Sequence, residues 1–329
     1  MNSSVLRPHR RQRILVTGAS GCVGHYVVED LLAQTDHEVV VLLRDRSRLR
    51  LKDAANPRLT IIEADIRDFE KYRGALVRID SAVLVAAAWG GPEAAQVNLD
   101  AANTLTAYLA TQGAGKVIYF STASVLDRDG ALLPAANEFG TDYIRSKYRL
   151  VQKMENYAGS LQVTGLFPTL VFGGDPTKPY SHFVKLLAQA RRWIWLMRLF
   201  RVPEGRFHVV HALDIARSVR CAIEAQRSSA TPGRLVLGNA AQGANDYLRE
   251  FCAHHENSLL FGINLNTRFA EALIRTFRIE LSPWDRYCML HPDQSYGHSV
   301  TPAVFDLPVA FPDFPSMLES VDFAKLSVE

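Results

Sequence analysis

The sequence predicts an α/β fold with a doubly wound parallel sheet and a smaller C-terminal portion. Strand-like and helical patterns alternate through the first half of the 329 residues. The strand-like runs are apolar throughout, which is typical of a parallel sheet covered by helices on both faces. A glycine-rich turn joins the first of these runs to the first helical pattern.

The first element is the apolar strand 13–17, which leads into Gly18, Gly21 and Gly24. Helical spacing of apolar residues resumes at 23–32. Such a turn lets the backbone approach a pyrophosphate, and the helix N-terminus offers unpaired N–H groups to it. The unit predicts a dinucleotide site, and a glycine turn without a ligand is the alternative.

The second strand is expected at 38–43, and a charged cluster follows it. In dinucleotide folds this position meets the adenosine ribose, where arginine favours a 2′-phosphate and an acid favours a free hydroxyl. Arg44 follows the strand directly and favours NADP, whereas Asp45, one residue later, keeps NAD open. A solvated charge cluster is the alternative.

The later elements continue the alternation. We expect strands at 59–63, 81–88, 115–121 and 161–167 and helices at 69–79, 92–112 and 141–157. Right-handed crossovers bring the carboxyl ends of parallel strands to one edge of the sheet, where ligands bind. Those ends carry Gly18, Arg44, Asp65, Ala88 and Thr122.

Hydroxyl, phenol and amine groups follow the fifth strand. Thr122 and Ser124 come directly after that strand. Tyr143 and Lys147 are four residues apart, so they share one helix face. A phenol has a reference pKa of about 10, and a lysine and an oxidised nicotinamide nearby would favour its ionised form. Tyr143 would then exchange a proton with a substrate oxygen that Thr122 hydrogen-bonds. A tyrosine–lysine pair that only decorates a helix is the alternative.

These motifs, in this order, resemble the extended short-chain dehydrogenase/reductase superfamily, specifically its NAD-dependent epimerase/dehydratase family. The resemblance covers about residues 13–220 and is weak after 228. The matching segments are TGASGCVG at 17–24, ADIRD at 64–68, VAAAWG at 85–90, QVNLDAANTL at 96–105, YFSTASV at 119–125, YIRSK at 143–147, LFPTLVFGG at 166–174 and HVVHALDIARSV at 208–219.

The resemblance implies a Rossmann-type fold, NADP or NAD as cofactor, and homodimerisation through the helices near 95–111 and 142–157. It implies Thr122, Tyr143 and Lys147 as the catalytic set, with Lys147 also holding the nicotinamide ribose. Cofactor contacts are implied for Gly18, Ser20, Gly21, Cys22, Val23, Gly24, Arg44, Asp65, Ile66, Ala86, Ala87, Ala88, Phe167, Pro168 and Thr169. Substrate contacts are predicted for Trp89, Asn98 and Ser124.

The sequence departs from the family pattern in three places. Leu126 and Asp127 replace a frequent Tyr-Gly pair, Ala86 replaces a frequent histidine, and Phe167 replaces a usual arginine. These departures speak against a standard nucleotide-sugar substrate and leave the catalytic set intact.

The substrate side of the molecule is expected in two segments. Residues 183–201 combine apolar bulk with flanking cations, which suits a lid over an apolar small-molecule substrate or a weak contact with an anionic membrane surface. An ordinary packed helix with a cationic rim is the alternative. We expect a disordered basic tail at 1–12, a cofactor domain at 13–170 plus 207–227, and a substrate portion at 171–206 plus 228–329.

Composition narrows the function classes. The net charge of +3 becomes −1 without the four arginines of the first thirteen residues, so no nucleic-acid partner is expected. No run reaches the ~18 apolar residues of a membrane span, and the arginine-rich start leads into a strand and not into a signal sequence. The four cysteines are widely spaced, which favours free thiols in a cytoplasmic setting, and no metal site is expected.

The sequence therefore predicts an NAD(P)-dependent oxidoreductase that transfers a hydride at a hydroxyl or carbonyl carbon, by reduction or epimerisation. A dehydratase often needs extra acids beside the hydroxyl motif, and Ala123 and Ser124 supply none. The alternatives are a nucleotide-sugar epimerase, an NADP-binding regulator and a membrane-associated assembly protein. A regulator would not need Thr122, Tyr143 and Lys147.

Overall fold

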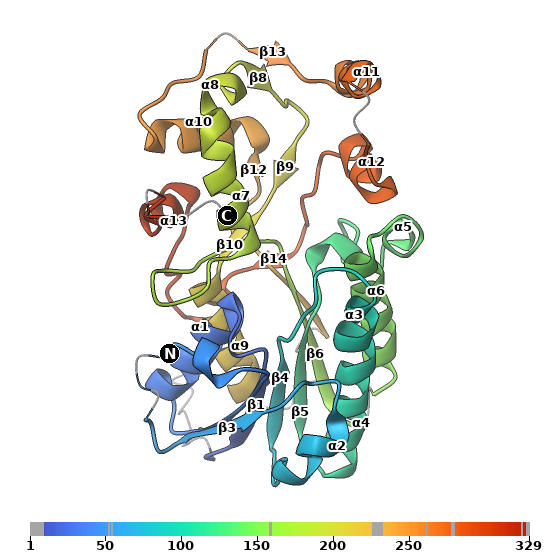
Figure 1. Cartoon of the computed structure of the whole chain (residues 1–329), viewed down its shortest axis with the longest axis vertical. Helices are drawn as coiled ribbons and strands as arrows, with labels where there is room; N and C mark the ends of the chain where they lie inside the picture. Colours follow the sequence, from blue (N-terminus) through green and yellow to red (C-terminus); the bar gives the residue numbers. More distant parts are fainter. Residues whose placement is uncertain are drawn as a thin grey trace, which may run out of the picture.

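The computed structural model describes residues 10–51, 53, 55–157, 160–225, 233–260, 262–277, 280–323 and 325–326. Its centre is an eight-stranded sheet whose described pairs are all parallel, in the order β14-β11-β6-β5-β4-β1-β2-β3 (Figure 1). The strands are β1 (Arg13–Thr17), β2 (Glu38–Leu43), β3 (Leu59–Glu63), β4 (Ser81–Leu84), β5 (Lys116–Phe120), β6 (Gln162–Pro168), β11 (Arg234–Leu237) and β14 (Ser299–Val300). The order reverses between β1 and β4, which confirms the doubly wound α/β fold.

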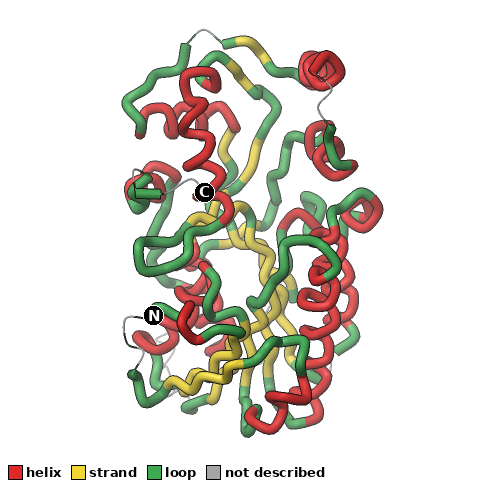
Figure 2. Tube along the Cα trace, viewed as in Figure 1, coloured by secondary structure: helices red, strands yellow, loops and turns green. Residues whose placement is uncertain are grey.

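Helices cover both faces of this sheet (Figures 1 and 2). One face packs against α1 (Cys22–Gln34) and α9 (Ala212–Glu224), and the other packs against α2 (Phe69–Tyr72), α4 (Ala102–Thr111) and α6 (Asp142–Glu155). Successive residues of β1 point to opposite faces of the sheet, and both faces are buried. The sequence of β1 is therefore apolar throughout and does not alternate with polar residues.

Two predicted elements are shorter than the sequence suggested. The helix expected at 69–79 is only α2 and a 3-10 turn at Arg73–Ala75, after which Arg78 adopts a positive φ of 55°. The strand expected at 81–88 ends at Leu84, because Thr17 and Asn98 take up the backbone groups of the following alanines.

A second group of helices forms an upper lobe above the carboxyl edge of the sheet (Figure 1). They are α7 (His182–Ala190), α8 (Ile194–Met197), α10 (Ala244–His254) and α13 (Phe314–Glu319), which bury Phe172, Val184, Phe251 and Met317 among them. Three two-stranded ribbons connect them: β7 (Leu170–Phe172) with β10 (Val209–His211), β8 (Phe200–Arg201) with β13 (Ile263–Asn264), and β9 (Arg206–Phe207) with β12 (Gln242–Gly243).

The remaining helices are α3 (Glu93–Ala95), α5 (Pro134–Glu138), α11 (Thr267–Phe277) and α12 (Pro283–Leu290). Stacked rings join α12 to α5, because Tyr287 lies against Phe139 with 6.2 Å between the ring centroids. Within the described residues, no helix is long and apolar enough to cross a membrane.

Two predicted boundaries differ in detail. β11 and β14 come from the portion expected to bind substrate, yet they complete the central sheet beside β6. Residues 1–9 of the predicted disordered tail lie outside the described residues. Residues 10–12 pack against the sheet, since Arg11 pairs with Glu38 at 3.0 Å and the Gln12 carbonyl accepts from the Glu38 amide at 2.9 Å.

Candidate active site

The glycine turn is tightly closed between β1 and α1. Gly18 has a φ of +69°, and a Cβ there would lie 2.7 Å from the backbone of Ala86. A Cβ on Gly24 would lie 2.2 Å from the Gly18 carbonyl oxygen. The missing side chains therefore let the end of β1, the alanine segment and α1 approach each other.

The start of α1 fits a phosphate group. Its N-cap is Gly21, which has no side chain to satisfy the first helical amides. The N–H groups of Cys22, Val23 and Gly24 are thus open to an anion at the positive end of a helix of 13 residues. Ser20, half-buried, precedes this cap.

Asn98 organises the alanine segment. Its side chain accepts from the Ala88 amide at 2.8 Å and donates to the Ala88 carbonyl at 2.8 Å and to the Ser146 hydroxyl at 2.9 Å. Asn98 is 1% exposed and lies in a π-helical turn, Gln96–Ala101, just before α4. The side chain of Asn98, a predicted substrate contact, is therefore engaged with protein groups and joins Ala88 to Ser146 of α6.

The lysine of the predicted set is anchored to the end of β5. Lys147, on α6, donates from Nζ to the Phe120 carbonyl at 2.9 Å, and its own carbonyl accepts from Ser121 Oγ at 3.4 Å. Thr122 follows these residues directly and caps a 3-10 turn by accepting from the Ser124 amide at 3.3 Å. The hydroxyl segment and the tyrosine–lysine helix are thus fastened together.

Tyr143 lies one turn before Lys147 on α6, which begins after the N-cap Thr141. The Lys147 Nζ is 5.9 Å from the centre of the Tyr143 ring. Burial raises the pKa of the Tyr143 phenol and lowers the pKa of Lys147 to about 8. The expectation that a lysine and an oxidised nicotinamide together favour the phenolate stays a prediction, since burial is the cause of the raised phenol pKa and the Lys147 ammonium is bound to a carbonyl.

An aromatic cover lies over Tyr143. The Trp89 ring is stacked on the Tyr143 ring with 4.7 Å between centroids and 18° between planes. The ring of His182, the first residue of α7, lies 4.1 Å from Trp89. Trp89 was predicted to touch substrate, whereas His182 carried no sequence signal, since only the fold brings α7 to this edge.

The two charged residues directly after β2, Arg44 and Asp45, lie in different environments. Asp45 Oδ1 accepts from the Ser47 amide at 2.9 Å and from the Ser47 hydroxyl at 2.6 Å, which also lowers the pKa of Asp45. The carboxylate thus closes its own turn. Arg44 is exposed at the carboxyl end of β2. This end of β2 lies beside the glycine turn, because the Gly18 amide donates a hydrogen bond to the Leu42 carbonyl at 3.3 Å.

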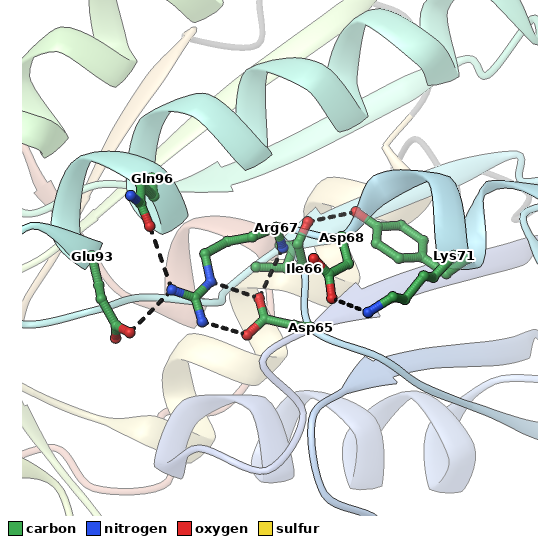
Figure 3. Close-up of polar contacts among 8 residues, drawn as sticks. Asp65, Ile66, Arg67, Asp68, Lys71, Glu93 and Gln96 are labelled. Carbon is green, nitrogen blue, oxygen red and sulfur yellow. Dashed lines mark hydrogen bonds and ion pairs between the residues drawn. The ribbon is translucent and has the colours of Figure 1, made fainter.

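Asp65, an implied cofactor contact, is held by Arg67, for which the sequence predicts no role (Figure 3). Arg67 donates to both carboxylate oxygens of Asp65, at 3.0 and 2.7 Å, and reaches Glu93 at 3.0 Å. The hydrogen bonds from Arg67 lower the pKa of Asp65 to about 2. The next residue, Ile66, is buried and its carbonyl accepts from Tyr72 at 2.8 Å. The DIR sequence thus fixes the loop after β3 to the start of α3.

The three residues at the end of β6 that are implied as cofactor contacts differ in how accessible they are to a ligand. The Phe167 ring is fully buried in the core beside Tyr119, so only its backbone is available to a ligand. Pro168 is also buried. Thr169 donates from its hydroxyl to the Leu237 carbonyl at 2.9 Å and serves the junction with β11.

An open helix start at the switch point of a doubly wound sheet is the mark of the dinucleotide-binding α/β proteins. Within that class, the chain belongs to the NAD dependent epimerase/dehydratase family, whose model matches residues 14–238. This match confirms the resemblance seen in the motifs and, at the level of the family, the prediction of an NAD(P)-dependent enzyme. No curated protein matches the sequence significantly.

Solved structures share the fold. A dTDP-glucose 4,6-dehydratase from Bacillus anthracis in complex with NAD has a TM-score of 0.67 at 13% identity, covering 95% of this chain and 96% of that chain. The Bordetella bronchiseptica enzyme WbmG in complex with NAD has a TM-score of 0.65 at 16% identity, covering 96% and 94%. A UDP-N-acetylglucosamine 4-epimerase from Methanobrevibacter ruminantium in complex with UDP-N-acetylmuramic acid has a TM-score of 0.61 at 19% identity, covering 78% and 86%.

Proposed function

We propose that this chain is an NAD(P)-dependent oxidoreductase that acts at a hydroxyl or carbonyl carbon, by reduction or epimerisation, with Thr122, Tyr143 and Lys147 as its catalytic set. The observation that carries the proposal is the bond from Lys147 Nζ to the Phe120 carbonyl at 2.9 Å. It joins the helix of Tyr143 to the strand end that presents Thr122.

The residues divide the work by their environment. Because burial raises the pKa of Tyr143, the phenol keeps its proton at neutral pH and is suited to donate it to a carbonyl oxygen. Thr122 orients the same oxygen. Lys147 remains largely protonated below its pKa of about 8 and binds a ribose hydroxyl. The nicotinamide, when bound, supplies the hydride donor or acceptor.

The first test replaces Tyr143 by Phe. Turnover is expected to fall about 100- to 10,000-fold, because proton transfer from a positioned side chain contributes on the order of 10²–10⁴. NADPH affinity, measured by fluorescence titration, should stay within a few-fold. Turnover at the wild-type rate would remove Tyr143 from its role.

We further propose that NADP is preferred over NAD. Support comes from Arg44, exposed at the ribose position, and from Asp45, whose carboxylate is engaged with Ser47. Arg44→Asp is expected to raise the NADPH dissociation constant at least about tenfold, since a charge-assisted contact is worth roughly 1.5–3 kcal/mol. NADH affinity should change little, and an unchanged ratio of the two affinities would count against this role of Arg44.

We infer an apolar small-molecule substrate, bound between the sheet edge and the portion formed by 171–206 and 228–329. Exposed Trp89 over Tyr143 and the stacked pair Phe139 and Tyr287 support this inference. The alternative is a nucleotide-sugar epimerase, because proteins of this fold include a UDP-N-acetylglucosamine 4-epimerase. An epimerase would convert a UDP-sugar without net cofactor consumption, whereas a reductase consumes NADPH stoichiometrically.

A homodimer through α4 and α6 and a cytoplasmic location belong to the same proposal, whereas a weak membrane contact by 183–201 is a separate proposal. The dimer rests on the family resemblance. The membrane contact rests on surface chemistry of its own.

A further inference from the structure

We propose that the upper lobe docks on anionic lipid bilayers through the end of the molecule formed by α7 and α8. The cationic aromatic face is defined here by Leu186, Trp193 and Trp195 together with Lys185, Arg191 and Arg192. It lies at the far end of the molecule from α2 (Figure 1). The proposal is independent of the proposed enzyme function.

Large apolar side chains point outward from this face. Leu186 is 58% exposed, Trp193 57% and Trp195 63%. Ile194, between the two tryptophans, is 4% exposed and packs in the upper-lobe core. The buried isoleucine fixes the segment, so both indoles are held in solvent. Tryptophan is the residue type that sits at the level of lipid headgroups.

The charge of the segment is entirely positive. Residues 182–201 contain five lysines and arginines and no aspartate or glutamate. Lys185, Arg191 and Arg192 are exposed. The negative surface potential of an anionic leaflet attracts such a cluster, and the apolar side chains add burial at the interface.

The fold adds apolar side chains that lie sixty residues later in the sequence. The Leu260 amide donates to the Arg198 carbonyl at 3.2 Å, and the Ile263 amide donates to the Leu199 carbonyl at 2.6 Å. Leu260 is 44% exposed and Ile263 51%. Leu260 and Ile263 thus add exposed apolar side chains to the backbone that lies beside the end of α8.

Charge selects the lipid over a second copy of the chain. A symmetric dimer brings the same patch of both copies together, so Lys185, Arg191 and Arg192 of one copy would face the same three cations of the other. An anionic bilayer offers the opposite charge to the same face. Charge complementarity thus favours lipid as the occupant.

The test is co-sedimentation of the full chain with vesicles of phosphatidylcholine alone or with phosphatidylglycerol at three parts to one. Binding is expected only to the anionic vesicles, at low salt, with a blue shift of tryptophan fluorescence. It should weaken steeply between ~0.05 M and ~0.5 M NaCl, as screening shortens the reach of the charges. No sedimentation with anionic vesicles at low salt would overturn the proposal.

Two variants separate the contributions. Arg191→Glu with Arg192→Glu should lower the affinity at least about 25-fold, since each cation near an anionic surface contributes roughly fivefold. Trp193→Ser with Trp195→Ser should abolish the blue shift and most of the binding. The matched controls are Arg73→Glu with Arg78→Glu, and Val77→Ser, which alter exposed residues at the opposite end.

Equal binding by the variants and the wild type would overturn the proposal. So would a loss of self-association in the tryptophan variant, measured by sedimentation velocity without vesicles, because the face would then be an interface between copies. The variant Tyr143→Phe should bind vesicles like the wild type. The vesicle assay therefore tests the membrane proposal separately from the catalytic proposal.

Discussion

At the scale of single residues, solvent exclusion decides the chemistry of Tyr143. The stack of Trp89 on the phenol ring contributes to its burial, and burial raises the phenol pKa. The Lys147 ammonium donates a hydrogen bond to the Phe120 carbonyl oxygen at 2.9 Å. The protonated phenol therefore suits the direction in which the substrate oxygen receives a proton.

This environment predicts the effect of Trp89→Ala on the pH profile. Removing the indole admits water, which lowers the Tyr143 pKa toward its ordinary value. The limb of kcat/KM that reports the phenol should move to lower pH in either reaction direction. Trp89→Phe keeps an aromatic ring in the stack and should leave the limb near its wild-type position. Identical limbs in all three proteins would show that Trp89 does not shield the phenol.

At the scale of elements, the three glycines of the first turn carry unequal constraints. A Cβ on Gly24 would lie 2.2 Å from the Gly18 carbonyl oxygen, inside van der Waals contact with fixed backbone. A Cβ on Gly21 would lie 3.3 Å from the same oxygen. The spacing motif treats these positions alike, whereas packing of α1 on the turn makes Gly24 the stricter one.

We therefore expect Gly24→Ala to be more damaging than Gly21→Ala. The first should lower the free energy of unfolding by about 1–3 kcal/mol through overpacking and weaken NADPH binding at least about tenfold. The second should cost less than about 1 kcal/mol. Gly74→Ala is the control, because nothing lies within 4 Å of a Cβ there. Urea unfolding and cofactor titration measure both effects, and equal damage at Gly21 and Gly24 would contradict the packing argument.

At the scale of the whole molecule, a buried histidine holds the sheet domain to the upper lobe. His211 is 2% exposed, and its ring lies 5.5 Å from that of Tyr26 on α1 and 3.8 Å from that of Phe311. Its Nδ1 accepts from the Leu213 amide at 3.1 Å and caps α9. Burial lowers the pKa of His211 to about 3, so the ring is neutral in the folded protein.

Acid should therefore loosen this junction. Well above pH 6.5 His211 is neutral in both the folded and the unfolded chain, so it adds no pH dependence to stability there. As the pH falls from 6.5 toward 3, the unfolded chain gains a proton that the folded chain excludes, and stability falls by up to about 1.4 kcal/mol per pH unit.

The variant His211→Asn keeps a capping acceptor for α9 and has no titrating ring. Its free energy of unfolding should be lower than that of the wild type at pH 7.5 and should fall less between pH 6.5 and pH 5. Urea unfolding across this range measures the difference. Parallel curves for the two proteins would show that His211 does not carry the acid sensitivity.

Sequence pattern was sufficient for the sheet domain because its evidence is local. The apolar run of β1, the glycine turn and the Thr141 cap of α6 are each encoded by neighbouring residues, and the structure has them where they were expected. The helix at 69–79 was overpredicted, because its apolar spacing persists past the point where Gly74 and the positive φ of Arg78 end the helix.

Contacts between segments that lie far apart in the sequence could not be predicted from the sequence pattern. Arg67 on Glu93, Asn98 on Ala88 and Ser146, and His182 on Trp89 each join residues that no local period relates.

By itself, the sequence determined the α/β class, the family and the order of the motifs along the carboxyl edge, because strand burial, glycine turns and helix caps depend on near neighbours. Only the tertiary structure decided how those motifs act on one another. It leaves less room for a side chain at Gly24 than at Gly21, and it hydrogen-bonds the Asn98 side chain to the Ala88 backbone. It also binds Lys147 to the Phe120 carbonyl and stacks Trp89 on Tyr143. The physical reason is that close packing, desolvation and hydrogen-bond partners are set by whatever the fold brings within a few ångströms, irrespective of separation along the chain.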